Sequence, residues 1–397
     1  MVIMTELPAP ADQIQELRFT VDFDYPAIFT RGVFRASNPA LADCLRRREP
    51  SRVPGFVAVI DAGVAAAWPN LATAIPLYAQ SRNLRLAAPA LVLPGGEAAK
   101  NGDGVVDAVL GLMREAGIDR HSFLVAIGGG AFLDAAGFAA ATCHRGVRLL
   151  RLPTTVLAQN DAAVGVKNGI NRFGSKNFIG SFAPPWGVIA DFDFLDTLEP
   201  RDRRAGLAEA VKVAAIRDSG FLEWLEEEAG ALAAFAPDAS EVMIRRSAAL
   251  HMRHIAEGGD PFETGSARPL DFGHWAAHKL ESMTGHALRH GEAVAIGIAL
   301  DGLYSAETGL LEGAAAERLC ALLERLGFRL FHPAMEARDG AGRRLVLDGL
   351  REFQEHLGGE LTLTMLAAPG RGCEIHAVDE AALDRCIGLL AERDRRP

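Results

Sequence analysis

The sequence lacks the features of a membrane or exported protein. Its apolar runs fall short of the roughly 18 residues that a membrane-spanning helix needs, and the longest candidate, residues 126–143, contains Asp134 and several glycines. The first residues include Glu6, Asp12 and Glu16 in place of the basic and apolar regions of a signal peptide. Cysteine is also scarce: the five cysteines are scattered, odd in number and never in a CxxC pattern. We therefore expect a protein of the reducing cytoplasm, without a membrane partner.

Lysine is rare, although the chain is rich in charged residues. Only five of the 41 lysine and arginine residues are lysines, and the formal net charge of −10 argues against a nucleic-acid partner. Lysine carries a compact ammonium where arginine carries a planar fork. A chain with this bias keeps lysine mainly where a compact charge is needed. Four of the five lysines lie in the motifs described below: Lys100, Lys167, Lys176 and Lys212.

The composition is otherwise that of an ordinary globular protein, 49% hydrophobic and 23% charged, and 397 residues suggest two or three domains. Up to residue 197, short apolar runs alternate with glycine turns and helix-compatible stretches, which predicts a parallel α/β sheet. The expected strands are 57–61, 90–93, 123–127, 147–152 and 188–190, with a helix over 131–143. Later segments predict helices over 201–235, 240–256, 274–283, 290–308 and 312–326, and a short strand over 360–366. We expect an α/β domain over 1–197 and a mainly α-helical domain over 198–397.

Three consecutive glycines, residues 128–130, follow an expected strand and open the next helix. Glycines in that place let backbone N–H groups approach a pyrophosphate, and the helix N-terminus favours negative charge. The alternative is a tight strand–helix turn that binds nothing. Ligands of open α/β sheets bind outside the carboxyl ends of the strands, which favours the first interpretation. Polar residues follow other expected strands at Asp61, Glu97, Lys100, Thr154 and Thr155.

Cationic and amide side chains gather in a glycine-rich segment. Arg145, Lys167, Lys176 and Asn177 fall within 33 residues. In an acidic chain this set suits a phosphate monoester held by point charges and an amide. A solvated basic loop is the alternative.

Histidines and a carboxylate in the second half have the composition of a divalent-metal site. Glu209 and Lys212 share a face of an expected helix, His274 and His278 are four apart on another, and His290 follows. Two histidines with a carboxylate are typical of a catalytic metal site with an open position. Structural histidines are the alternative, and the spacing leaves open which of the three histidines bind the ion.

The order of these motifs resembles that of the sugar phosphate cyclases, the family of 3-dehydroquinate synthase. The resemblance extends from residue 61 to about residue 356 and is densest from 128 to 297. It rests on the runs at 128–134, 145–148, 153–155, 161–167, 176–177, 206–212, 272–274 and 290–297.

The resemblance implies a Rossmann-like N-terminal domain, a helical C-terminal domain, and NAD with Zn²⁺ or Co²⁺ between them. The implied metal ligands are Glu209, His274 and His290. The implied NAD contacts are Asp61, Glu97, Lys100, Gly129, Gly130, Asp134, Thr154, Thr155, Lys167, Lys176, Phe194 and Thr197. The implied substrate contacts are Asp161, Lys176, Lys212, Arg268, Asp271 and His278, with Lys167, Asn177 and Arg145 on the phosphate. Arg145 would reach in from the second subunit of a homodimer.

Departures from the synthase pattern concern the end of the substrate that carries a carboxylate. Asp271 stands where asparagine is usual, Arg268 is displaced by one position, and usual lysines are missing from the preceding helix and from 351–356. The nearest cations there are His251, Arg253, His254 and His356. A desolvated carboxylate beside a substrate carboxylate is strongly repulsive. The pattern therefore predicts a substrate with a hydroxymethyl group, sedoheptulose 7-phosphate, and resembles the 2-epi-valiolone synthase branch.

The expected enzyme is a lyase that recycles NAD. It would oxidise a ring hydroxyl, eliminate phosphate, return the hydride, open the ring and close a valiolone-type cyclitol by an aldol step. One alternative is 3-dehydroquinate synthase proper. Another is an NAD- and metal-dependent polyol dehydrogenase, which needs no phosphate cradle and releases NADH. The third is a non-catalytic member of the family that binds NAD and metal.

Overall fold

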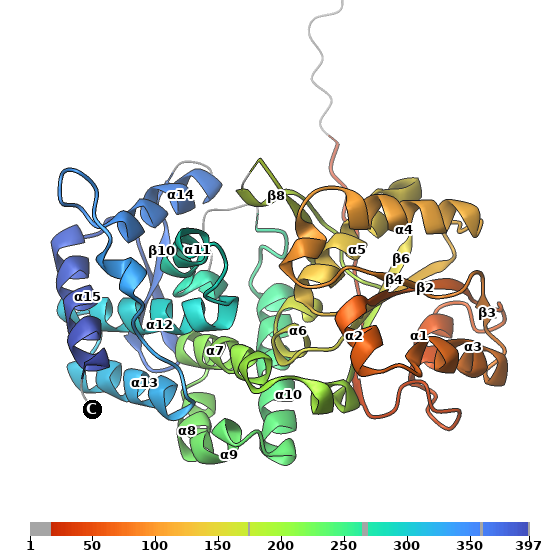
Figure 1. The fold of residues 1–397 in the computed structure, drawn as a ribbon, viewed down its shortest axis with the longest axis horizontal. Coiled ribbons are helices and arrows are strands. Elements are labelled where there is room, and N and C mark those ends of the chain that lie inside the picture. Colours follow the sequence, from red (N-terminus) through yellow and green to blue (C-terminus); the bar gives the residue numbers. More distant parts are fainter. Residues whose placement is uncertain (1–16, 174, 264–268, 358–359, 396–397) are drawn as a thin grey trace, which may run out of the picture.

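The computed structural model describes residues 17–173, 175–263, 269–357 and 360–395. Within them, the buried apolar runs of the first half form a seven-stranded parallel sheet, and the second half is mainly helical (Figure 1). The strand order is β1-β9-β6-β5-β2-β3, and β4 also pairs with β2. The strands are β1 Ala27–Thr30, β2 Gly55–Asp61, β3 Arg85–Leu86, β4 Leu91–Leu93, β5 Phe123–Gly128, β6 Arg148–Pro153 and β9 Gly187–Asp191.

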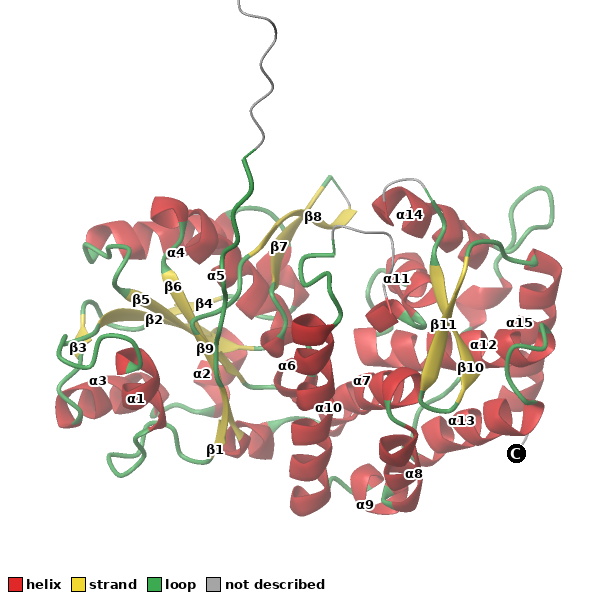
Figure 2. Ribbon diagram, turned by 180° about the vertical axis from the view of Figure 1, so that it is seen from behind, coloured by secondary structure: helices red, strands yellow, loops and turns green. Residues whose placement is uncertain are grey.

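Helices cover both faces of this sheet, because its strands carry apolar side chains on both sides. Val57 and Val59 of β2 pack with α4 and α5, whereas Phe56 and Ile60 pack with α1 and α3. Figure 2 shows the same layers from behind. The carboxyl ends of the parallel strands meet at one edge. The helices of this half are α1 Ala40–Arg46, α2 Ala62–Ala67, α3 Leu71–Ser81, α4 Gly104–Glu115, α5 Gly130–Thr142 and α6 Val156–Asn160.

The second half is built around α12, which is buried along nearly its whole length. Close packing depends on glycine: a Cβ on Gly297 of α12 would lie 1.9 Å from the carbonyl oxygen of Gly273, which precedes α11. An antiparallel pair of strands, β10 Leu363–Ala368 and β11 Arg371–Ile375, lies beside the helices. The helices are α7 Pro200–Arg217, α8 Ser219–Glu227, α9 Ala229–Ala233, α10 Pro237–Glu257, α11 His274–Met283, α12 His290–Glu307, α13 Gly313–Arg325, α14 Asp348–Leu357 and α15 Glu380–Asp394.

A β-hairpin connects the two halves in space. β7 (Lys167–Arg172) and β8 (Ser175–Phe182) pair antiparallel, and both views show β8 reaching from the sheet toward α11 and α14 (Figures 1 and 2). The sequence predicted only that this segment is rich in glycine and contains cationic side chains. Three of the expected phosphate and cofactor residues therefore lie on regular strands.

The predicted fold class is confirmed, and the predicted strands and helices agree with the structure apart from small shifts at their ends. The expected helix over 201–235 is divided into α7, α8 and α9. The predicted domain boundary at 197/198 stays a prediction; a short 3₁₀ helix, Phe192–Thr197, ends there and α7 follows at Pro200. No helix among the described residues is long and apolar enough to cross a membrane. All five cysteines are unpaired.

Candidate functional site

Turns at the carboxyl edge of the sheet carry several residues expected to bind NAD. Gly129 directly precedes α5, and Oγ1 of Thr155 caps α6 by accepting a hydrogen bond from the N–H of Ala158 at 3.1 Å. Asp61 ends β2 and accepts from the N–H of Gly63 at 2.8 Å. Backbone donors, hydroxyls and a carboxylate therefore follow one edge, which is the set of groups that a dinucleotide needs.

The glycines of this edge have different roles. A Cβ on Gly128 would lie 2.6 Å from the ring of Phe132, and one on Gly95 would lie 2.0 Å from Asp61, so both positions need glycine for packing. A Cβ on Gly129 would meet its nearest neighbour, Thr155, at 3.5 Å. The backbone of Gly129 is therefore open to close approach, as a pyrophosphate-binding turn requires, and the residues present fit a dinucleotide.

Lys100 joins residues expected at NAD to one expected at the phosphate. Its Nζ donates to Oδ2 of Asp134 at 2.7 Å and to Oδ1 of Asn177. Asp134 lies on α5 and Asn177 on β8, so this ammonium ties the hairpin to the sheet half. The expected cofactor and phosphate positions are therefore adjacent.

Trp68 contacts two residues expected at NAD, although no motif in the sequence pointed to it. Its Nε1 donates to Oγ1 of Thr197 at 3.0 Å, and its ring packs edge-on against Phe194 with centroids 5.6 Å apart. Glu97, also expected there, is exposed on a 3₁₀ turn after β4. An indole at the end of a helix after β2 gives no pattern that sequence reasoning recognises.

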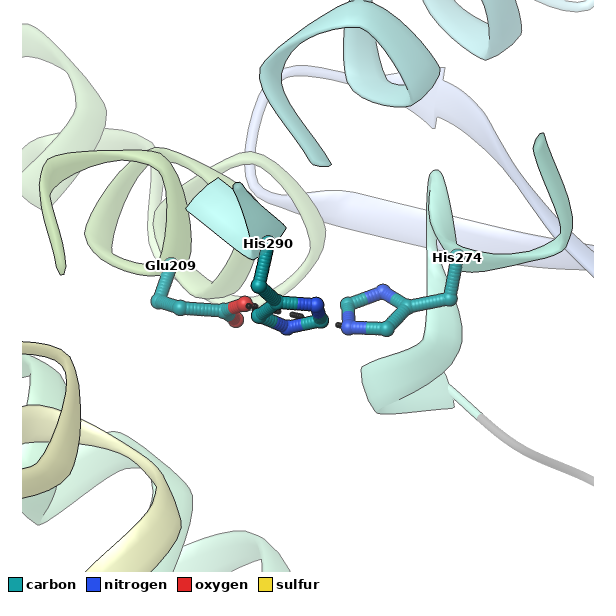
Figure 3. A group of neighbouring side chains, drawn as sticks. All are labelled: Glu209, His274 and His290. Carbon is teal, nitrogen blue, oxygen red and sulfur yellow. Dashed lines mark ion pairs between the residues drawn. The ribbon is translucent and has the colours of Figure 1, made fainter. Parts of the chain in front are cut away.

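Three expected metal ligands converge from three helices (Figure 3). Glu209 comes from α7, His274 begins α11 and His290 begins α12, and one ligand atom from each lies within 4.8 Å of the others. Oε1 of Glu209 is 3.3 Å from Nε2 of His290 and 3.7 Å from Nε2 of His274. Neither oxygen of this buried carboxylate receives a well-aligned hydrogen bond from the described residues. Two imidazole nitrogens and a carboxylate oxygen that lie close to one another fit a divalent ion.

The outer nitrogens of both imidazoles are held by acceptors. Nδ1 of His274 lies 3.2 Å from the carbonyl oxygen of Phe272, and Nδ1 of His290 lies 3.2 Å from Oε2 of Glu281. Because these oxygens only accept, each Nδ1 carries the proton and each Nε2 faces the cluster. Burial opposes a charged His290, but the carboxylates of Glu209 and Glu281 on either side of the ring outweigh burial and raise the pKa of His290 to about 10. A bound cation would replace the proton on Nε2.

Glu281 is a site residue that sequence reasoning missed. It lies on α11, seven residues after His274 and three after His278, so it is on the same side of the helix as both. That periodicity was the available signal. Oε1 of Glu281 accepts a hydrogen bond from Nζ of Lys176 at 2.7 Å. Lys176, expected at cofactor or substrate, therefore contacts the surroundings of the metal cluster.

Lys212 stands between two carboxylates beside the cluster. Its Nζ lies 2.5 Å from Oε2 of Glu209 and 3.6 Å from Oδ1 of Asp161. Burial opposes the charge, but the two carboxylates outweigh it and hold the pKa of Lys212 above its ordinary value. Nδ1 of His251, from α10, lies 2.8 Å from Asp161. This group of charged hydrogen-bonding side chains suits a substrate rich in hydroxyls.

Asp271 and Lys167 place opposite charges near the same cluster. Burial favours a neutral Asp271, but Lys167 and the nearby His274 outweigh it and lower the pKa of Asp271, so its side chain is a carboxylate. Nζ of Lys167 lies 2.7 Å from Oε1 of Glu263 and its side chain is 55% exposed. His278 is exposed beside the cluster, with its ring centroid 5.4 Å from that of His274.

One expected residue, Arg145, is not brought to the site within its own chain. Arg145 is exposed beyond the C-terminal end of α5, whereas the glycine turn lies at the other end of that helix. Thirteen residues of helix separate the two ends, about 20 Å. One chain alone therefore leaves Arg145 away from the cluster. Arg268 lies outside the described residues.

Comparison with known proteins agrees with this arrangement. The sequence models for the 3-dehydroquinate synthase N-terminal and C-terminal families match residues 90–205 and 206–342. The 3-dehydroquinate synthase of Paracoccus denitrificans is 40% identical over 76% of this chain and 81% of its own length. That of Acidithiobacillus ferrooxidans is 36% identical over 86% of this chain and 91% of its own.

A solved structure shares both the fold and part of the sequence. It is ValA, a 2-epi-5-epi-valiolone synthase from Streptomyces hygroscopicus subsp. jinggangensis, solved with NAD⁺ and Zn²⁺ bound. The TM-score is 0.85 at 27% identity, with 96% of this chain and all of that chain covered. A 2-deoxy-scyllo-inosose synthase has a TM-score of 0.75 at 22% identity over 91% of this chain and 95% of that chain, which shows the fold. The chain belongs to the 3-dehydroquinate synthase family, within the sugar phosphate cyclases.

Proposed function

We propose that this protein binds NAD and a divalent metal ion and converts sedoheptulose 7-phosphate to a valiolone-type cyclitol with release of phosphate. The family supports cyclisation of a sugar phosphate, and the NAD⁺ and Zn²⁺ bound to ValA support the cofactors. Zn²⁺ fits the donor set of Glu209, His274 and His290, and Co²⁺ has the same preference for imidazole and carboxylate.

When bound, NAD accepts and returns a hydride, and the ion polarises an oxygen of the sugar. Asp161 and Lys212 stand beside the three metal ligands, where they orient ring hydroxyls by hydrogen bonding. Lys167 supplies a largely exposed positive charge for the phosphate, which must compete with Glu263 for that ammonium. Arg145 completes the phosphate cradle from the second chain of a homodimer, because in its own chain it is at the wrong end of α5.

The choice of substrate rests on the presence and place of Asp271. It lies in the turn before α11, where burial favours the neutral acid but the charge of Lys167 counteracts burial and lowers the pKa of Asp271. A substrate carboxylate at this place would meet a second negative charge in a partly buried setting. A hydroxymethyl group meets no such repulsion. A difference of about 3 kcal/mol gives on the order of a hundredfold preference.

The test compares kcat/KM for sedoheptulose 7-phosphate and for the deoxy-heptulosonate phosphate used by 3-dehydroquinate synthase, on one enzyme preparation. We expect the neutral-headed sugar to be favoured by about a hundredfold. Asp271→Asn removes the charge and should narrow that ratio, mainly by improving turnover of the acidic sugar. Asp384→Asn, on the exposed face of α15, should leave the ratio unchanged.

The relatives at 36% and 40% identity support a second candidate, 3-dehydroquinate synthase activity. Equal or faster turnover of the acidic sugar by the unmodified enzyme would select it. An unchanged ratio in Asp271→Asn would remove the electrostatic argument.

A further inference from the structure

We propose that Glu281 is a positioning residue for the metal ligand His290, and that Lys176 on the hairpin holds Glu281 in place. The affinity for the metal ion then depends on a contact between the two halves of the chain. This inference rests on the metal-binding part of the proposed function. Glu281 and Lys176 are themselves outside the set of three proposed metal ligands.

The two oxygens of Glu281 have different partners. Oε2 faces Nδ1 of His290 at 3.2 Å, and Oε1 accepts from Nζ of Lys176 at 2.7 Å. The opposite nitrogen of the same imidazole, Nε2, lies 3.3 Å from Glu209. Lys176, Glu281, His290 and Glu209 therefore form a continuous chain of contacts from β8 to α7.

Glu281 is buried, so its negative charge is costly unless other groups compensate it. The side chain of Glu281 is 3% exposed, so its charge needs partners within the protein. Burial favours the neutral acid, but hydrogen bonds from His290 and the charge of Lys176 outweigh it and hold the pKa of Glu281 far below its ordinary value. A carboxylate behind a metal-binding imidazole fixes the ring and the proton on its outer nitrogen. Loss of such a partner typically weakens metal binding ten- to a hundredfold.

Lys176 adds the link between the halves. It lies on β8, whose strand pairing belongs to the first half, whereas Glu281 lies on α11 of the second (Figure 1). An ammonium on Oε1 turns Oε2 toward His290. If the hairpin moves away from α11, Glu281 loses the contact with Lys176. Glu281 is then free to turn away from His290, and the orientation of that imidazole is no longer fixed.

The first test is Glu281→Gln, read as the dissociation constant for Zn²⁺ in competition with a chromophoric chelator. Glutamine has one acceptor oxygen where glutamate has two, so either Lys176 or His290 faces an amide NH₂. We expect Zn²⁺ binding to weaken ten- to a hundredfold, with NAD binding retained. Glu352→Gln is the matched control, because it breaks an ion pair between Glu352 of α14 and Lys279 of α11. It should leave the Zn²⁺ affinity unchanged.

A double-mutant cycle that combines Glu281→Gln with Lys176→Met tests the link itself. Independent effects multiply in the dissociation constants. In the double variant no ammonium competes for the single amide oxygen of the substituted side chain, so that oxygen is free to accept from Nδ1 of His290. We therefore expect Zn²⁺ binding in the double variant to be tighter than the product of the two single effects.

Each outcome decides between the claims. If the unmodified protein binds no Zn²⁺, the proposed metal site itself is wrong. If the unmodified protein binds Zn²⁺ and Glu281→Gln binds it equally well, only the positioning role of Glu281 is wrong. If the effects of the two substitutions on the Zn²⁺ dissociation constant simply multiply, the link through Lys176 is wrong. Should Glu281→Gln not fold, Glu281→Asp replaces it: the shorter carboxylate should alter the absorption spectrum of bound Co²⁺, and an unchanged spectrum would overturn the proposal.

Discussion

Arg151 is fully buried, yet its residue type and position gave no sign of a role in the site. Its guanidinium donates to the carbonyl oxygens of Ala163 at 3.0 Å, Gly165 at 2.8 Å and Lys167 at 3.0 Å, and to Oδ1 of Asn168 at 2.6 Å. Burial lowers the pKa of Arg151. It shapes the loop between Asp161 and Lys167.

Arg151→Met should test this interpretation at the scale of one residue. Methionine fills much of the space but removes the Arg151 donor from three buried acceptors and one partly buried acceptor, so we expect the free energy of unfolding to fall by about 3 kcal/mol or more. The KM for the sugar phosphate should rise because Lys167 is no longer held. Urea unfolding and steady-state kinetics measure both. Arg318→Met, at an exposed position of α13, should change neither the free energy of unfolding nor the KM. If Arg151→Met also changed neither, this interpretation of Arg151 would be wrong.

Chemistry-bearing residue types made the metal cluster predictable. A glutamate and histidines on expected helices are uncommon enough to be recognised, and the structure brings Glu209, His274 and His290 together. Glu281 and Arg151 were missed because their roles depend on what lies opposite them. A glutamate on a helix and an arginine in a strand are common in any protein. Their roles can be recognised only when the residues that they contact in the folded chain are known.

At the scale of elements, the packing of α12 against α11 contains a buried acid. Asp301 of α12 accepts hydrogen bonds from Nε1 of Trp275 at 2.8 Å and from the N–H of Gly273 at 2.9 Å. Burial outweighs these bonds and raises the pKa of Asp301 to about 7. The contact therefore holds the start of α11 with a carboxyl group that resists ionisation.

This contact predicts how stability depends on pH. The pKa of Asp301 is higher in the folded than in the unfolded protein, so its contribution is greatest below about pH 4, falls as the pH rises toward 7, and is constant above. Between pH 5 and pH 8 the unmodified protein should lose on the order of 2 kcal/mol that Asp301→Asn does not lose. Urea unfolding of both proteins at the two pH values measures the difference. If the free energy of unfolding changes equally with pH in the unmodified protein and in Asp301→Asn, Asp301 does not titrate as described.

Elements were predictable where the hydrophobic pattern was strong. The central strands are continuous apolar runs, and α13 repeats its buried residues at helical spacing, so both kinds of element appear close to their expected positions. The hairpin was not predictable, because β7 and β8 are rich in glycine, asparagine and charge. Its order comes from tertiary contacts: Asn168 of β7 is held by Arg151, and a Cβ on Gly137 of α5 would lie 1.8 Å from Asn168.

At the scale of the whole molecule, motif order was enough to predict the fold class and the superfamily. Substrate choice depends on a few side chains around a shared site, and relatives named for one substrate do not decide it. Arg145 shows a second limit, since its expected role needs another copy of the chain. The homodimer stays a prediction.

One measurement tests the central claim most directly: release of phosphate from sedoheptulose 7-phosphate by the protein loaded with NAD and Zn²⁺, followed together with NADH absorbance. We expect phosphate to be released over many turnovers while NADH never exceeds the number of active sites, because the hydride is returned in each cycle. One NADH accumulated per turnover would indicate a dehydrogenase. Phosphate released only from the deoxy-heptulosonate phosphate would contradict the proposed substrate.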